Sequence, residues 1–502
     1  MMERFKLNLV KPTLMRVFNI CFMIIFSYIF LNIIFQRSIL WSSWHKPFII
    51  LSGALFLLFL LILLNKWLLK CSEKRLKMIT GINFFLLFLI QLFCFRFFMV
   101  QPTWDFGAVL NLAIEGVHSS KGMAPYLYFM YPNNIPLYIF FMIVVKILSV
   151  IGVNDYLPVL IMINMLIVFL SAGLTYYLIL KRLHLKQATL FSFYMLLIVP
   201  FYLYTTIVYT DTLAMIFPIL SAIIYMIYLD SKHSKRYLWI ILLSVVLTVG
   251  ILVKTNVVIM LVAILIHYLM TQKGLKVWLF CLLLIFPLLT INMGYKEVIS
   301  RYSPLAKEEM GYPAVHWVLM GLKELPNRPG GFNQEIVDLT WELKSKGLTN
   351  KEIMEEEIDL IKEQLSEYGV QGYLDFLSRK INYTWGDGTY YAPKKLSLKP
   401  LDNNSFQAYV FGEKSETFVL FCQMVHVMNL LLIVVAAISL IKSTNQFEQL
   451  LTICLFGTFL FLLIWEARSR YLVLYVPIIC VVSMYGFKQL NGLISRMKWL
   501  SR

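Results

Sequence analysis

The sequence predicts an all-α polytopic membrane protein with about 12 transmembrane helices, and three observations carry this prediction. Of the 502 residues, 59% are apolar and only 15% are charged, a composition outside the range of soluble globular chains. Apolar windows of roughly 20 residues, the length that crosses a bilayer, recur along almost the whole chain. Short clusters of lysine and arginine separate many of these windows. The net charge of +17 is therefore a topology signal, and we expect a lipid bilayer and no nucleic acid as partner.

The predicted spans fall into an N-terminal transmembrane module, 1–293, and a C-terminal group of helices, 417–502. Each span is an apolar run that ends at a polar or basic cluster. Their expected bounds are 13–35, 47–66, 78–100, 157–180, 187–204, 211–229, 237–253, 255–270, 276–293, 417–441, 449–465 and 470–487.

One further apolar segment, 135–152, is predicted to lie on the outer membrane surface. It carries Lys146 in its middle and follows a Tyr-Pro-Asn-Asn-Ile-Pro stretch, which favours an interfacial helix over a span. This placement puts every major basic cluster on one side, as the positive-inside rule requires. Both termini are then cytoplasmic, and two long segments lie outside: the first loop, 101–156, and a hydrophilic domain, 294–416.

The outer domain, 294–416, is expected to be folded, mixed and mainly helical. Thr349 and Glu352 form a capping-box pattern, which opens a helix. Apolar residues recur at helical spacing after it, and Gly369 is a stop signal. These features predict a helical extracytoplasmic domain, not a linker.

Asp105 is the sharpest candidate for chemistry in the first outer loop. It lies a few residues beyond the third predicted span, between Trp104 and Phe106. Partial desolvation by these rings would favour proton uptake from an attacking hydroxyl group. The alternative is an N-terminal cap for a helix that starts at Phe106.

A second outer acid, Asp211, and a lysine, Lys254, lie at predicted turns on the same membrane face. Asp211 could orient a partner or support a divalent cation, or it could simply cap a helix. Lys254 departs from the positive-inside rule, which makes it a candidate for an anionic ligand such as a lipid phosphate. The alternative for Lys254 is contact with ordinary lipid headgroups.

The last predicted outer turn carries a compact charged motif, Glu466-Ala-Arg468-Ser-Arg470-Tyr471. The guanidinium groups of Arg468 and Arg470 suit phosphate oxygens, and Glu466 could orient one of them. Headgroup anchoring with the flanking aromatic residues is the alternative.

Two stretches of the outer domain combine aromatic rings with hydrogen-bonding groups. His316 and Trp317 lie in one, and Trp385 and Asp387 lie in the other. They could contact a sugar or an acceptor, but the core of a small domain would use the same residues. The histidines show no metal-ligand spacing, so no cofactor is certain and metal dependence stays open.

In this order, the elements resemble the GT-C superfamily of membrane glycosyltransferases, especially the bacterial branch similar to protein O-mannosyltransferases and lipid A aminoarabinose transferases. The resemblance covers most of the chain. It rests on Asp105, the surface-lying segment at 131–152, Asp211, Lys254 and the motif at 466–471. Two departures are visible: two spans precede the one that leads into Asp105, and a single aspartate stands where some branches have paired acids.

The resemblance implies that Asp105 is the general base, or lies close to it. It also implies that Lys254, Arg468 and Arg470 hold the phosphate of a polyprenyl-phosphate-linked monosaccharide, and that Asp211 supports the acceptor or a cation. The implied acceptor is a hydroxyl group on a cell-envelope glycopolymer, lipid or protein. The implied location is the bacterial cell membrane.

A lipid-linked sugar flippase or transporter is the alternative function, because it would also need many spans and interfacial charges. Transporters usually place ionisable groups near the bilayer midplane and often show repeated halves. Here the notable charges lie at one membrane edge, beside a folded domain, which favours the transferase. A polysaccharide polymerase that uses oligosaccharide donors is a third possibility.

Overall fold

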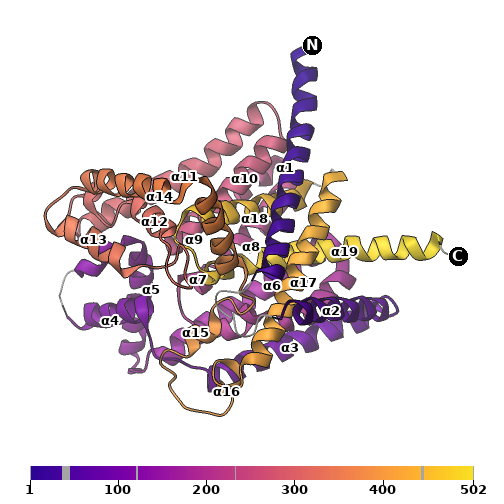
Figure 1. Cartoon of the computed structure of the whole chain (residues 1–502), viewed down its shortest axis with the longest axis horizontal. Helices are drawn as coiled ribbons and strands as arrows, with labels where there is room; N and C mark the ends of the chain where they lie inside the picture. Colours follow the sequence, from indigo (N-terminus) through magenta and orange to yellow (C-terminus); the bar gives the residue numbers. More distant parts are fainter. Residues whose placement is uncertain (1, 37–45, 120–122, 232, 443–445, 501–502) are drawn as a thin grey trace.

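The structure is a computed structural model that describes residues 2–36, 46–119, 123–231, 233–442 and 446–500 (Figure 1). Within these ranges every named element is a helix. The all-helical prediction is therefore confirmed for the part of the chain that is described. Eleven of its helical segments are long and apolar enough to cross a membrane.

The elements follow the predicted order closely. The helices that pack together before the outer segment are α1 (Met2–Phe35), α2 (Pro47–Leu68), α3 (Glu73–Phe97), α6 (Leu157–Tyr194), α8 (Ile216–Asp230), α9 (His233–Val253), α10 (Val258–Thr271) and α11 (Leu275–Ser300). Those at the C-terminal end are α17 (Glu416–Lys442), α18 (Gln446–Ile464) and α19 (Val476–Leu500). α17 packs against α1, α2 and α19 at the centre of the bundle.

The count of eleven differs from the expected 12 for three reasons. The predicted span 157–180 and the first part of the predicted span 187–204 are joined in one helical segment, Leu157–Leu197, which is kinked at His184. The apolar helix at Thr255–Thr271 is shorter than the other spans. In the other direction, Pro132–Val150, which is predicted to lie on the surface, is long and apolar enough to cross.

The region of the predicted span 187–204 is a broken helix. α6 is interrupted at His184, where φ is 74°, and ends at Tyr194, after which three short 3-10 turns follow. Broken backbone at membrane depth is tolerated only where protein buries it and other groups satisfy its carbonyls. Here Asn164 Nδ2 donates to the carbonyls of Tyr204 and Thr205, both at 2.8 Å. Gln91 Nε2 donates in the same way to Phe201 O at 2.7 Å.

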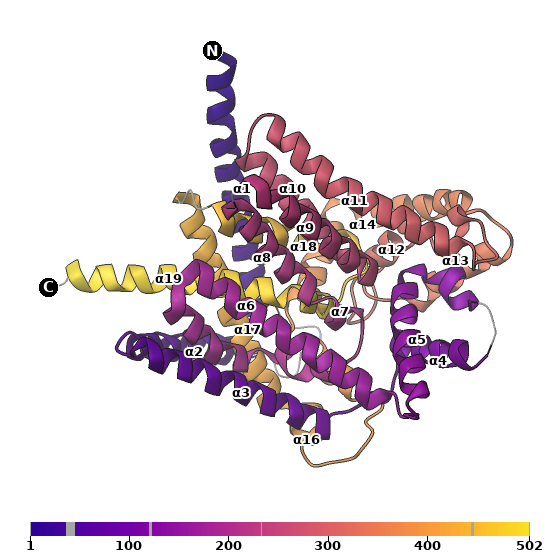
Figure 2. The same cartoon turned by 180° about the vertical axis from the view of Figure 1, so that it is seen from behind.

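The segment predicted as the first outer loop forms a helix pair, α4 (Trp104–His118) and α5 (Ile135–Val150). They bury apolar faces on each other, with Val109 and Ala113 of α4 beside Phe141 and Val145 of α5. The pair lies at the edge of the molecule that also carries α12, α13 and α14 (Figures 1 and 2). The end of α19 points away from this edge (Figures 1 and 2). Whether α5 crosses the membrane stays a prediction, as does the side on which the termini lie.

The segment predicted as the outer domain contains α12 (Ala314–Leu322), α13 (Gln334–Ser345), α14 (Asn350–Trp385), α15 (Ala392–Leu396) and α16 (Gln407–Val410). The capping box is present: Thr349 Oγ1 accepts from the Glu352 backbone, and Glu352 accepts from the Thr349 backbone. The predicted stop at Gly369 is a sharp break with φ 56°, and the helix resumes directly after it. Glycine adopts this left-handed conformation without the steric cost that a Cβ atom brings.

The end of α14 and the turn after it enter the helical bundle. Trp385 is 1% exposed and packs edge-on against Phe26 of α1, with ring centroids 5.5 Å apart. Gly388 lies so close to α17 that a Cβ atom on it would meet the carbonyl oxygen of Cys422 at 2.5 Å. The buried Lys380 ammonium donates to the carbonyls of Gly321, Leu463 and Trp465, and so ties α12 and the end of α18 to α14.

Candidate active site

Asp105 accepts hydrogen bonds from two tyrosines. Tyr126 Oη donates to Oδ1 at 2.8 Å, and Tyr209 Oη donates to Oδ2 at 2.6 Å. Asn134 Nδ2 in turn donates to Tyr126 Oη at 3.1 Å. Thr103, not Asp105, occupies the N-cap position of α4. The carboxylate is therefore fixed in place by side chains from two other segments, and capping does not explain it.

Tyr126 and Tyr209 stay protonated and donate to this carboxylate. Burial, followed by the charge of Asp105, raises the pKa of both Tyr126 and Tyr209 well above the ordinary tyrosine value. Both hydroxyl groups are thus permanent donors near neutral pH. Donors of this kind hold a carboxylate in a fixed orientation.

Asp211 is fully buried and lies between two cations. Its Oδ1 is 2.7 Å from Lys254 Nζ, and its Oδ2 is 3.0 Å from Arg470 Nε. Lys254 Nζ also lies 3.5 Å from Thr210 Oγ1. Neither carboxylate oxygen receives a hydrogen bond of good angular geometry, so the contact is an ion pair set by distance. Lys254 and Arg470, which are far apart in the sequence, therefore meet at Asp211.

Tyr209 connects the two acids. Its hydroxyl group bonds Asp105, while its ring faces Arg470 at 4.8 Å and Lys254 at 5.8 Å, within the range of cation–π attraction. Arg468 is also buried, and its guanidinium lies 5.4 Å from the ring of Trp104. The predicted base and the predicted phosphate ligands therefore share one cluster of charged groups and aromatic rings.

A fourth basic residue, Lys395 of α15, lies in the same cluster. Its Nζ is 3.1 Å from the ring centroid of Trp104 and 5.9 Å from that of Tyr209. Burial, together with the nearby Arg470 charge, lowers the pKa of Lys395 to about 5, although Asp105 opposes the shift. The amine is thus neutral near pH 7 in the absence of a further anion.

Backbone pairing brings α15 and the start of α4 together. Gln101 N donates to Lys399 O at 2.8 Å, and Leu401 N donates to Met99 O at 3.0 Å. Trp104 then has a φ of 54° and Tyr391 a φ of 68°, both in the left-handed region that bulky side chains rarely adopt. Such backbone strain tends to be retained at functional sites, where the surrounding structure imposes it. Here it occurs on the two aromatic residues that face Arg468.

Glu466 and Asp387 support the loop that carries the arginines. Glu466 accepts from Tyr471 Oη at 2.9 Å, and its backbone N–H donates to Trp317 O. Asp387 is buried and accepts from the backbone N–H groups of two residues in its own turn and from Ser469 Oγ at 2.7 Å. Glu466 and Asp387 therefore fix the loop that carries Arg468 and Arg470, and Asp387 ties this loop to the turn that follows α14.

The remaining candidates lie apart from the charged cluster or are enclosed by packing. His316 is buried, with Nδ1 2.7 Å from Thr340 Oγ1 and 3.5 Å from Glu357 Oε1. The side chain of Trp385 is enclosed as well. The burial of His316 and Trp385 favours the interpretation that both are core residues and do not contact a sugar or an acceptor. Trp317 is only partly buried, and its ring lies 6.0 Å from that of Tyr131, which in turn lies 5.1 Å from the ring of Tyr126.

The described side chains offer little for a metal ion. No group of three or more His, Cys, Asp and Glu side chains able to hold a metal occurs among the described residues. Asp211, the acid expected to support a cation, has both oxygens beside cations of the protein itself.

The sequence analysis missed Tyr126, Tyr209 and Lys395. Tyr209 is two residues before Asp211, and its position in that outer turn could have suggested it. Tyrosine is too frequent, with 28 copies in the chain, for its type to be a signal. Lys395 follows Lys394 directly, and only the structure distinguishes the buried lysine from the exposed one.

The fold and this cluster define a polytopic membrane protein with a charged site beside the ends of several helices. A family model described as a conserved hypothetical integral membrane protein matches residues 7–490, so the chain belongs to that family. No curated protein and no solved structure matches it.

Proposed function

We propose that the protein is a membrane glycosyltransferase of the GT-C type. It transfers one monosaccharide from a polyprenyl-phosphate-linked donor to a hydroxyl group of an extracytoplasmic acceptor in the bacterial cell envelope. The proposal rests on one observation: Tyr209 contacts both the predicted base and two of the predicted phosphate ligands. A fixed carboxylate, Asp105, lies on one side of this residue, and two cations, Lys254 and Arg470, lie against its ring.

In the proposed reaction Asp105 takes the proton from the acceptor hydroxyl group. The acceptor oxygen forms a bond to the anomeric carbon, and the bond from that carbon to the phosphate oxygen breaks. The polyprenyl phosphate leaves with one more negative charge than it carried in the donor. The hydrogen bonds from Tyr126 and Tyr209 would orient the carboxylate for proton transfer.

The cationic residues would stabilise the charge that develops on the leaving phosphate. Fixed cations in a buried setting stabilise developing charge without reorganisation at the moment of reaction. Arg468 and Arg470 are both buried, and guanidinium groups match phosphate oxygens well. The neutral Lys395 is poised to take up a proton when an anion arrives, because a nearby negative charge favours the protonated amine.

Mass analysis of envelope glycopolymers, from cells that contain or lack the protein, tests the proposed function. We expect the loss of one type of monosaccharide substituent in cells without it. Restoring the protein with Asp105→Asn should not restore the substituent. Asp359→Asn is a matched control, because Asp359 is an exposed carboxylate of α14 that forms an ion pair with the nearby, equally exposed Lys362.

Two outcomes would contradict the transferase. If Asp105→Asn restored the substituent as well as the control does, Asp105 would not be the base. If the protein moved a labelled lipid-linked sugar across a vesicle membrane and formed no glycosylated product, the flippase alternative would replace the transferase.

A further inference from the structure

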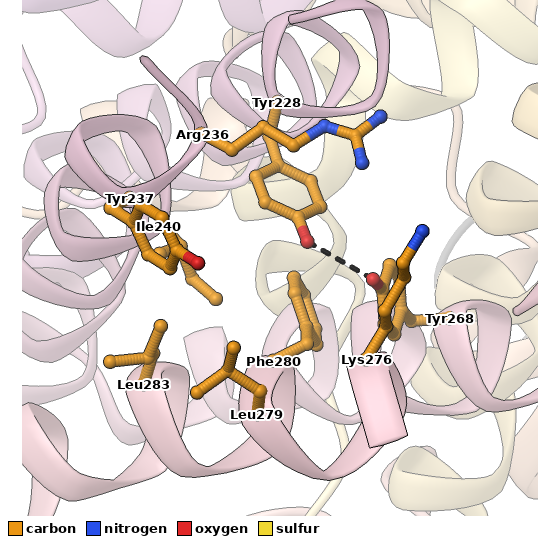
Figure 3. Close-up of a pocket in the computed structure, with 9 residues that line it drawn as sticks. All are labelled: Tyr228, Arg236, Tyr237, Ile240, Tyr268, Lys276, Leu279, Phe280 and Leu283. Carbon is orange, nitrogen blue, oxygen red and sulfur yellow. Dashed lines mark hydrogen bonds between the residues drawn. The ribbon is translucent and has the colours of Figure 1, made fainter. Parts of the chain in front are cut away.

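A second polar site lies at the opposite ends of the helices that border the candidate active site. α8 begins next to Asp211 and α9 ends next to Lys254, whereas a pocket of about 100 Å³ lies between the end of α8, the start of α9, the end of α10 and the start of α11. Its lining includes Tyr228, Arg236, Tyr268, Lys276 and Phe280 (Figure 3). It shares no residue with the candidate active site.

Three aromatic rings form the floor of this pocket. Tyr228 Oη and Tyr268 Oη are hydrogen bonded at 3.0 Å. The ring of Tyr268 stacks on Phe280, with centroids 3.8 Å apart, and Tyr228 lies 5.1 Å from Phe280. A floor of interlocked rings gives the pocket a defined shape and presents hydroxyl groups at its base.

The described residues that line the pocket include two cations and no carboxylate. Arg236 is held in place because its Nε donates to Ser231 O at 2.8 Å and its Nη2 donates to Leu229 O at 3.2 Å. Among the side chains that the structure describes, Arg236 Nη1 and Lys276 Nζ have no hydrogen-bond or ion-pair partner. In Figure 3 the nitrogen ends of both side chains extend on the same side of the tyrosine pair. The pocket thus offers two positive charges to one anion.

Exposed apolar side chains continue outward from the pocket along both flanking helices. Ile241 on α9, and Leu279 and Leu282 on α11, are 46%, 41% and 60% exposed. An anion that docks at Arg236 and Lys276 would therefore have a path for a hydrocarbon chain beside it. Basic pockets between helices at a membrane boundary are suited to anionic lipid headgroups.

We propose that this pocket binds the phosphate group of an anionic glycerophospholipid, with an acyl chain along α9 and α11. Arg236 and Lys276 contact the phosphate oxygens, and the Tyr228 and Tyr268 hydroxyl groups lie below it. The pocket shares no residue with the candidate active site, so this proposal does not depend on the proposed transferase activity.

Native mass spectrometry of the full-length protein in detergent tests the proposal, with phosphatidylglycerol, phosphatidylcholine and inorganic phosphate as separate probes. We expect phosphatidylglycerol to be retained by the wild type and the retention to fall about thirtyfold in the double variant Arg236→Gln/Lys276→Gln, since each cation near the headgroup contributes about fivefold. The matched control is Lys235→Gln/Lys273→Gln, which removes two positive charges from the same two connections outside the pocket.

Three results would overturn the proposal. These are equal retention by the two double variants, equal retention of phosphatidylcholine by the wild type, and saturation by inorganic phosphate at the concentration that the lipid needs. Because Arg236 also bonds the end of α8, the single variant Lys276→Gln is measured as well. Lys276 is exposed, so this variant should fold normally and still lose several-fold in retention.

Discussion

Replacing Lys395 with methionine should stabilise the protein, and the gain should shrink as the pH rises. Lys395 is 7% exposed, and its pKa falls from 10.5 to about 5 on folding. Between these two values the unfolded chain carries a proton that the folded chain lacks. Folding must release this proton, which costs free energy that grows as the pH decreases.

The size of the effect follows from the two pKa values. At pH 7 the amine lies 3.5 units below its unfolded pKa of 10.5, which corresponds to about 5 kcal/mol at roughly 1.4 kcal/mol per unit. At pH 9 the same calculation gives about 2 kcal/mol. Methionine has a similar length and no charge, so the variant removes this cost without a large cavity. The stabilisation should therefore decrease by about 3 kcal/mol between pH 7 and pH 9.

Unfolding of wild type and Lys395→Met in mixed detergent micelles, measured at several pH values, checks this prediction. Lys394→Met is the matched control, because Lys394 is the exposed neighbour in the same helix and should give no such trend. A stability difference between Lys395→Met and wild type that stays constant from pH 7 to pH 9 would refute the reasoning.

Three further predictions concern the same cluster. Tyr209→Phe keeps the ring but removes the 2.6 Å hydrogen bond to Asp105, so sugar transfer should fall about tenfold or more while donor binding, measured by lipid retention, is unchanged. Asp211→Asn leaves the buried Arg470 and the partly buried Lys254 without their counter-charge and should lower the unfolding free energy by about 3 kcal/mol or more, whereas Asp230→Asn, at an exposed helix end, should not. Binding of polyprenyl phosphate near pH 7 should make Lys395 take up a proton, which buffer-dependent calorimetry detects as a heat that varies with the buffer; a buffer-independent heat would contradict this.

Much of the fold could be predicted because spanning helices need long apolar runs, and such runs are visible in any sequence. The break in the region 187–204 could not be predicted in this way. Its residues are as apolar as those of a regular span, and the irregular backbone depends on Asn164, from an earlier part of α6, and on Gln91 of α3. The burial of Trp385 inside the bundle could not be predicted either, because its partner Phe26 is distant in the sequence.

The charged members of the candidate site could be predicted because charges are conspicuous in an apolar chain. Asp211, Lys254 and Arg470 were expected on one face, and the structure places them in one ion-paired group. Which acid pairs with which cation depends on how the helix ends meet, and spacing along the chain does not contain that information. The burial of Lys395, and hence its low pKa, is likewise a property of packing alone.

The most direct test of the central claim is sugar transfer by the purified protein in proteoliposomes that contain undecaprenyl-phosphate-linked hexoses labelled in the sugar, together with a crude envelope acceptor. The proposed mechanism predicts release of undecaprenyl phosphate and labelled acceptor with the wild type, and a loss of about a hundredfold or more with Asp105→Asn. Transfer by Asp105→Asn at the wild-type rate would contradict the assignment of Asp105 as the base.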